Sequence, residues 1–224
     1  MISKAPLAGR RRQQRSIDTR KRIVAAALSE FARSGFDGSS TRGIAEAAGI
    51  PHSLVLHHFG GKDALWRETV HETVRIYAER ITSDGGSEHD DAASRLRNHF
   101  AAYIRFSAQH PDMFRMMTQE NTLGSERLSW LVDAHTRALV ETVTTLIGRA
   151  QADGTFIAGD PLQLLYIFLG AATGPYRSTA ELRLLGVDDP ASPMRIDAHI
   201  AACEQMFFKP ASIRPTFVTG TNHS

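Results

Sequence analysis

Hydrophobic residues recur at helical spacing along most of the chain, beginning near residue 17. Between residues 17 and 34, the apolar residues Ile23, Ala27 and Phe31 follow one another at intervals of four. On a helix, that spacing puts the three side chains on one face, where they can be buried together. We therefore predict an amphipathic helix over residues 17–34, ended by Gly35, a residue type common at helix C-termini.

Two short helices, separated by a glycine, are predicted next. Ser40 is a residue type that caps helix N-termini, and Gly49 ends the helix that follows it. Pro51 stands at the start of another helix, a position where its missing N–H costs nothing. The glycine pair at 60 and 61 then breaks the chain before a longer helix. The predicted helices span residues 41–48, 51–59 and 62–82.

The polar, glycine-rich stretch at residues 83–87 is predicted to join two domains. Beyond it, the apolar pattern is again helical, and Gly174-Pro175 is expected to kink or split one of the helices. No stretch of the sequence has the alternating pattern of a strand, so the predicted fold class is all-α. The helices of this second part are predicted at residues 89–109, 111–119, 125–152, 160–185 and 192–209.

Charge is distributed unevenly between these two parts. Residues 1–80 hold 14 Lys and Arg against 8 Asp and Glu, whereas the whole chain has a net charge of only +2. A basic end indicates contact with a polyanion such as nucleic acid. The single cysteine, Cys203, excludes an intrachain disulfide and favours the cytoplasm. The longest apolar stretch, residues 162–174, is too short to span a membrane.

Two short helices joined by a glycine turn have the spacing of a helix-turn-helix, although a helical corner of purely structural use has the same spacing. In a helix-turn-helix, the second helix lies in the DNA major groove and the first braces it. The small residues Ala45 and Ala48 allow the two helices to approach closely. The side chains then expected to face outward are Arg42, His52, Ser53, Leu56, His57 and His58.

The order and spacing of residues around this motif are specific. They include Arg22-Ile23, Ala26-Ala27, Phe31, Gly35-Phe36, Thr41, Ile44-Ala45, Ala48-Gly49-Ile50, His58-Phe59, Lys62 and Leu65. With these residues the segment 17–77 resembles the DNA-binding domain of the tetracycline-repressor-type (TetR) family. The resemblance implies a three-helix N-terminal domain, a C-terminal helical bundle for ligand binding and dimerisation, and a homodimer that binds a palindromic operator, usually as a repressor.

The resemblance also implies the DNA-binding positions, among which Lys62 matches the family's phosphate-binding lysine. Two residues depart from the family pattern. Leu56 stands where a tyrosine is usual, so one phosphate contact is in doubt, although a leucine can instead contact a thymine methyl. Gly43 replaces a common acidic residue and weakens its helix. The residues expected at the DNA are Ser40, Thr41, Arg42, His52, Ser53, Leu54, Leu56, His57, His58 and Lys62.

Aromatic residues and methionines gather around the helix breaks of the second part. Such side chains line adaptable apolar pockets, and they equally fill cores. We predict that they form a pocket for an apolar or amphipathic small molecule of unknown identity. The expected pocket residues are Phe100, Tyr103, Phe106, Phe114, Met117, Trp130, His135 and Tyr166.

The last two predicted helices carry apolar stripes, which serve dimerisation, packing on their own domain, or both. In the TetR family, helices at this place form the dimer interface. The expected interface residues are Leu165, Leu169, Ile196, Ile200, Cys203 and Phe207. The predicted layout is therefore a disordered basic arm (1–16), a helix-turn-helix domain (17–82), a ligand-binding and dimerisation domain (88–209) and a flexible tail (210–224).

Catalytic and metal chemistry find no support in the sequence. His57 and His58 are adjacent, so on a helix they point about 100° apart and do not readily share a metal. Gly61-Lys62 lacks the other residues of a phosphate-binding loop. We expect no enzyme activity, no cofactor and no metal site. The remaining alternative to a ligand-responsive regulator is an architectural DNA-binding module without an effector.

Overall fold

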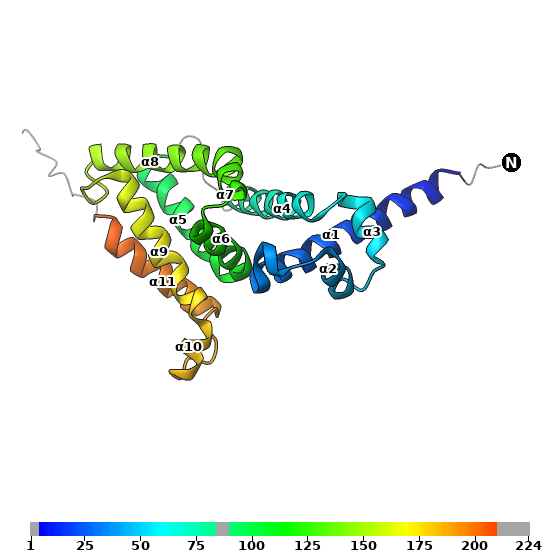
Figure 1. Ribbon diagram of the computed structural model, residues 1–224. Coiled ribbons are helices and arrows are strands. Elements are labelled where there is room, and N and C mark those ends of the chain that lie inside the picture. Colours follow the sequence, from blue (N-terminus) through cyan, green and yellow to red (C-terminus); the bar gives the residue numbers. More distant parts are fainter. Residues whose placement is uncertain (1–4, 84–89, 210–224) are drawn as a thin grey trace, which may run out of the picture.

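The computed structural model describes residues 5–83 and 90–209, and over these ranges the chain is helical apart from its connections and one isolated β-bridge between Phe156 and Phe208. The predicted all-α class is therefore confirmed. Figure 1 shows an elongated molecule, with the first three helices at one end and a bundle of longer helices at the other. The predicted tail, residues 210–224, lies outside the described residues.

The N-terminal part contains four helices around one small core. The long first helix packs on both short helices and on the fourth, and Ile23, Phe31, Ile44, Leu65 and Trp66 are fully buried between them. These residues include the stripe that predicted the first helix. The helices are α1 (Ala5–Gly38), α2 (Thr41–Ala47), α3 (His52–Phe59) and α4 (Lys62–Ser83).

Helix α1 begins at Ala5, so the prediction of a disordered arm over residues 1–16 is wrong from residue 5 onward. Most residues between 7 and 15 are Ala, Leu, Arg and Gln, which are strong helix formers, and Pro6 lies in the first turn, where proline is tolerated. At the other end, Gly35 has φ 70° and ψ 174°, which breaks the helix at the predicted residue before one more turn forms.

The C-terminal part is a bundle whose core is rich in phenylalanine. Phe100 stacks on Phe168 with ring centroids 3.4 Å apart, and Phe156 and Phe207 pack against the same pair. The expected break near residues 121–124 is present, with Gly124 in the left-handed region. The helices are α5 (Ala92–Gln109), α6 (Pro111–Leu123), α7 (Glu126–Leu131), α8 (Arg137–Ala152), α9 (Pro161–Arg177), α10 (Thr179–Leu184) and α11 (Pro193–Phe207).

Besides shifts of a few residues at helix ends, two predicted segments take a different course in the structure. The single helix expected over residues 125–152 is interrupted by a π-helical turn, η1 (Val132–Thr136). Helix α9 continues through Pro175 and ends only at Ser178. Proline leaves the carbonyl of Ala171, four residues earlier, without its helical partner. His199 on α11 lies beside this turn, with its Nδ1 3.2 Å from the hydroxyl of Tyr176, and the helix continues through the proline without a break.

The two parts share a core, whereas the sequence predicts separate domains joined at residues 83–87. Most of this joint lies outside the described residues. Met116 of α6 and Leu131 of α7 are buried in the N-terminal core rather than in the bundle. The side-chain amide of Gln119 also donates to the carbonyl of Ala32 at 3.1 Å. The N-terminal part therefore packs directly on α6 and α7. None of the described helices is long and apolar enough to cross a membrane.

Candidate DNA-binding surface and effector cavity

The turn between α2 and α3 is fixed from both sides. Ser40 caps α2, as predicted, by accepting a hydrogen bond from the backbone N–H of Gly43 at 3.0 Å. Gly49 adopts φ 63°, a left-handed conformation that glycine tolerates best. The guanidinium of Arg22 on α1 donates to the carbonyl of Ala48 at 2.7 Å and anchors the same turn. The pair α2–α3 is thus a braced helix-turn-helix.

A polar contact also joins the starts of the two helices, where the hydroxyl of Thr41 lies 2.9 Å from Nε2 of His52. Val55 and Phe59 of α3 are buried, which turns the rest of that helix outward. Ser40, Arg42, Ser53, Leu54, Leu56 and His57 are exposed, whereas Thr41, His52, His58 and Lys62 are half-buried. All ten lie on or directly next to α2 and α3 or at the start of α4, at the end of the molecule away from the bundle (Figure 1). Leu56 keeps 42% of its surface exposed, as a methyl-contacting residue needs.

His58 differs from its neighbour His57 because it is half-buried and its ring lies near a buried residue. Its ring centroid lies 6.1 Å from that of Phe59, whose other neighbour is the guanidinium of Arg20. Partial burial, the neighbouring His57 and the charge of Arg20 all lower the pKa of His58. The neutral form of its ring is therefore favoured. Its ring neighbours are His57 and Phe59 of the same helix, and it is half-buried, so it is less available to DNA than the exposed His57.

Lys62, the predicted phosphate contact, has a structural role that the sequence did not indicate. Its ammonium donates to the carbonyls of Phe36 at 2.7 Å and Ser39 at 3.0 Å, and it lies 4.4 Å from the centre of the Phe36 ring. These bonds tie the start of α4 to the chain between α1 and α2. An ammonium has three N–H donors, so the phosphate contact remains compatible with the two bonds.

Replacing Lys62 with alanine is expected to have two separable effects. Loss of two charge-assisted hydrogen bonds should lower the free energy of unfolding by about 1–3 kcal/mol. Loss of the phosphate contact should flatten the slope of log affinity against log salt by about one counterion, similarly for all DNA sequences. Urea unfolding and salt titrations of DNA binding measure the two effects. A changed sequence preference with an unchanged salt slope would contradict the phosphate assignment.

A partly open cavity of about 330 Å³ lies in the bundle beside the N-terminal part. Its wall comes from α4, α5, α6, α7, η1, α8 and α9, and is mainly apolar. Seven of the eight predicted pocket residues line it: Phe100, Tyr103, Phe106, Phe114, Met117, His135 and Tyr166. The prediction also missed wall residues, most notably Val74 and Tyr77, because they belong to α4, which was assigned wholly to the other domain.

Trp130 was predicted in the pocket but does not line the cavity. It packs instead on α4, where its ring centroid lies 5.8 Å from that of Trp66 and 5.2 Å from that of His71. The guanidinium of Arg67 covers its ring at 4.6 Å. The turn of α7 directs this tryptophan toward the DNA-binding part, which periodicity alone does not predict.

The six residues predicted at the dimer interface face their own domain. Leu165, Cys203 and Phe207 are almost completely buried, and Ile196 is buried as well. Leu169 and Ile200 are half-buried and pack against the same core. Burial raises the pKa of the Cys203 thiol, in keeping with the small apolar role expected of it. The strongest apolar stripe of each helix therefore packs in the core of its own domain.

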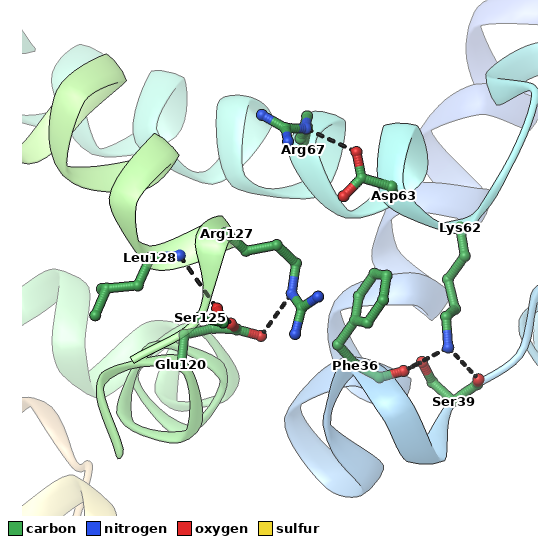
Figure 2. A network of polar contacts seen from close by, with 9 residues as sticks. All are labelled: Phe36, Ser39, Lys62, Asp63, Arg67, Glu120, Ser125, Arg127 and Leu128. Atoms are coloured by element: carbon green, nitrogen blue, oxygen red, sulfur yellow. Dashed lines mark hydrogen bonds and ion pairs between the residues drawn. The ribbon is translucent and has the colours of Figure 1, made fainter. Parts of the chain in front are cut away.

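A buried ion pair links α6 and α7 to the DNA-binding part. Glu120 is 2% exposed, and its carboxylate accepts hydrogen bonds from Nε of Arg127 at 3.1 Å and from the hydroxyl of Ser125. The guanidinium of Arg127 lies 3.7 Å from the centre of the Phe36 ring. Figure 2 shows Phe36 between Arg127 and Lys62, so one series of contacts runs from α6 to the start of α4.

Family comparisons agree with this architecture in both parts. The pattern described as "Bacterial regulatory proteins, tetR family" matches residues 23–69. That described as "Tetracyclin repressor-like, C-terminal domain" matches residues 93–206, which alone is half of the chain. The chain belongs to the tetR family. It is a DNA-binding transcriptional regulator with a helix-turn-helix at its N-terminus, as the sequence motif predicted.

Relatives within the tetR family are distant. The transcriptional regulator RutR of Escherichia coli K12 is 24% identical over 170 residues, 75% of this chain and 79% of RutR. The repressor AcnR of Corynebacterium glutamicum is 23% identical over 159 residues, 68% of this chain and 76% of AcnR. The regulatory protein RaaS of Mycobacterium tuberculosis is 54% identical, but over only 44 residues. These relatives are regulators rather than enzymes.

Solved structures of tetR-type proteins share the fold. SCO4942 from Streptomyces coelicolor superimposes with a TM-score of 0.63 and 27% identity, covering 86% of this chain and 99% of its own. AibR, solved with isovaleryl coenzyme A and operator DNA, gives a TM-score of 0.68 at 18% identity with the same coverage. Among the described residues, no three His, Cys, Asp or Glu side chains are grouped as a metal site requires.

Proposed function

We propose that this tetR-family regulator is a repressor that binds a two-fold operator as a homodimer and releases it when an apolar small molecule fills the cavity. The observation that carries the proposal is the wall of the cavity. Val74 and Tyr77 belong both to that wall and to α4, the helix that begins at Lys62 directly after α3. A ligand in the cavity therefore touches the element that holds the recognition helix.

The DNA contacts divide into two kinds. Arg42 and Lys62 carry the cationic side chains at the ends of the motif and bind phosphates, which gives affinity without sequence preference. His52, Ser53, Leu56 and His57 lie on the outward side of α3 and contact base edges in the major groove. The positive balance of the first eighty residues supports this assignment. A bacterial regulator of this kind acts in the cytoplasm, where the chromosome lies.

The homodimer is proposed to form through the outward faces of α9 and α11. On α9 these faces present Ile167, Gly170 and Gly174, and on α11 they present Ala198, Ala202 and Met206. Ile167 and Met206 are 56% and 60% exposed, large values for apolar side chains. A side chain added at Gly170 or Gly174 would meet nothing within 4 Å. Small residues at such a face let helices of two subunits approach closely.

In this proposal, effector binding changes the affinity for DNA through two routes. Tyr77 packs its ring against Phe106, with centroids 5.0 Å apart, so a ligand that moves this ring displaces α4. Met117 of α6 lines the cavity one turn before Glu120, whose ion pair reaches Phe36. Either movement changes the separation of the two recognition helices, which must match the ~34–36 Å between successive major grooves.

The proposal is tested first at the DNA. Genomic fragments retained by the purified protein should share a palindromic site, on which Arg42→Ala weakens binding at least tenfold and His57→Ala changes the preferred bases. Arg33→Ala removes the same charge from an exposed part of α1 far from α3 and should leave affinity within about twofold. Fragments without a common two-fold site would contradict the proposal. Retention of such sites together with a failure of every ligand to change DNA affinity would favour an architectural module.

A further inference from the structure

The cavity is partly open, and the exposure of its wall residues indicates where the opening lies. Asn121, near the end of α6, and Tyr166, on α9, are exposed, whereas the other described residues of the wall are half-buried or buried. Helices α6 and α9 pack on each other, so the two exposed residues belong to neighbouring helices. Tyr166 keeps 58% of its surface exposed although it lines the cavity. We therefore assign the opening to Asn121 and Tyr166.

On α9, the opening continues into an apolar strip formed by Leu162, Tyr166, Ile167 and Gly170. Leu162, Tyr166 and Gly170 follow one another at intervals of four, which puts them on one side of the helix. Leu162 and Ile167 are 47% and 56% exposed. Gly170 is exposed as well, and a side chain added there would meet nothing within 4 Å. The strip therefore begins at the opening and is uncovered within this chain.

A second copy of the chain is the partner that fits this apolar strip. Regulators of the tetR family bind operator DNA as dimers. Among the described residues, most of the large apolar side chains that are exposed lie between residues 162 and 206, in the segment that carries the proposed dimer interface. Monomeric proteins rarely expose continuous apolar surface, which marks interaction sites instead. Gly170 also lets a helix of another subunit approach closely.

We propose that a second copy of this chain closes the opening at Tyr166, so that the effector site is complete only in the dimer. The inference rests on the proposed function in taking the cavity as the effector site and α9 and α11 as the dimer interface. It goes further, because a molecule in the cavity then contacts both subunits. Such a molecule acts directly on the arrangement of the subunits, which sets the separation of the recognition helices.

Thiol labelling measures whether the opening is covered. The single cysteine, Cys203, is buried, and burial raises the pKa of its thiol, so it reacts slowly. Tyr166→Cys places a reactive thiol at the opening. Its labelling should be about tenfold slower, or more, in the dimer than in a protein that also carries Ala202→Glu, which is expected to separate the subunits. Thr142→Cys, an exposed position of α8 outside the wall, should be labelled at equal rates in both states.

Sedimentation of the same samples separates the possible outcomes. Rapid labelling of Tyr166→Cys in a protein that sediments as a dimer would overturn the inference and leave the homodimer intact. A monomer without Ala202→Glu would refute the proposed homodimer and the inference with it. Slow labelling in both states would mean that the chain covers its own opening, and deletion of residues 210–224 would show whether the tail does so. Gln163→Cys, three residues earlier on α9, replaces Tyr166→Cys if that change itself disturbs the dimer.

An uncharged fluorescent probe, N-phenyl-1-naphthylamine, tests the consequence for ligand binding. Met117→Trp fills the cavity, so the signal that it removes is the part that comes from the cavity. That part should show binding about tenfold tighter, or more, in the dimer than in Ala202→Glu, because only the dimer removes the whole probe from water. Equal affinities would mean that the partner covers the opening without completing the site, which contradicts the inference. If the dimer has no cavity signal at all, the proposed effector site is refuted, whatever the labelling shows.

Discussion

Replacing Ala202 with glutamate is expected to separate the dimer into monomers and to reduce operator affinity at least 100-fold. Ala202 is exposed on α11, one turn after Ala198, which is exposed as well. In the interface the new carboxylate would be buried without a counter-ion, which costs more than a small apolar contact provides. Each recognition helix would then bind its half-site alone and lose the 10²- to 10⁴-fold advantage of linked binding.

Sedimentation at micromolar concentration and operator titration measure these two effects together. Thr142→Glu introduces the same charge on an exposed position of α8 and should leave both the dimer and its affinity unchanged. Phe207→Asp, by contrast, should unfold the bundle, since Phe207 is 2% exposed within its core. A dimer that survives Ala202→Glu with full operator affinity would place the interface elsewhere.

Arg127→Met is expected to cause the largest loss of stability among single changes at the domain junction, about 3–5 kcal/mol in the free energy of unfolding. The change leaves the carboxylate of Glu120, 2% exposed, without its cation. An uncompensated buried charge of this kind costs several kcal/mol, because the surrounding protein cannot replace water. Ser125 alone would then hydrogen-bond the carboxylate.

The double variant Glu120→Leu with Arg127→Met tests the cause of that loss. Removing both charges should restore most of the stability, to within about 1–2 kcal/mol of the unaltered protein. Arg115→Met breaks an exposed ion pair with Asp112 on α6 and should cost less than 1 kcal/mol. Urea unfolding measures all three. If Arg127→Met and Arg115→Met lowered the free energy of unfolding equally, the buried pair at the junction would stabilise the protein no more than the exposed pair does.

Several features were predictable from the sequence because they depend on local spacing. Ser40, Gly49 and Gly35 mark a cap, a turn and a helix end through their own backbone chemistry, and each acts so in the structure. The stripe of Ile23 and Phe31 likewise identified a buried helix face. Family membership followed from the same segment, since the helix-turn-helix lies within one short run of residues.

Other features were decided only by the packing of distant segments. Periodicity finds the most apolar face of a helix, and in α9 and α11 that face, with Leu165 and Phe207, packs on its own bundle rather than on a partner. The contribution of α4 to the cavity wall likewise arises only when two domains meet. The two hydrogen bonds of Lys62 were likewise not predictable from local spacing, because their carbonyl acceptors lie more than twenty residues away in the sequence. The sequence determined most of the helical segments and the position of the helix-turn-helix. The tertiary structure decided which faces remain free, since a side chain is covered by whatever the rest of the chain brings to it.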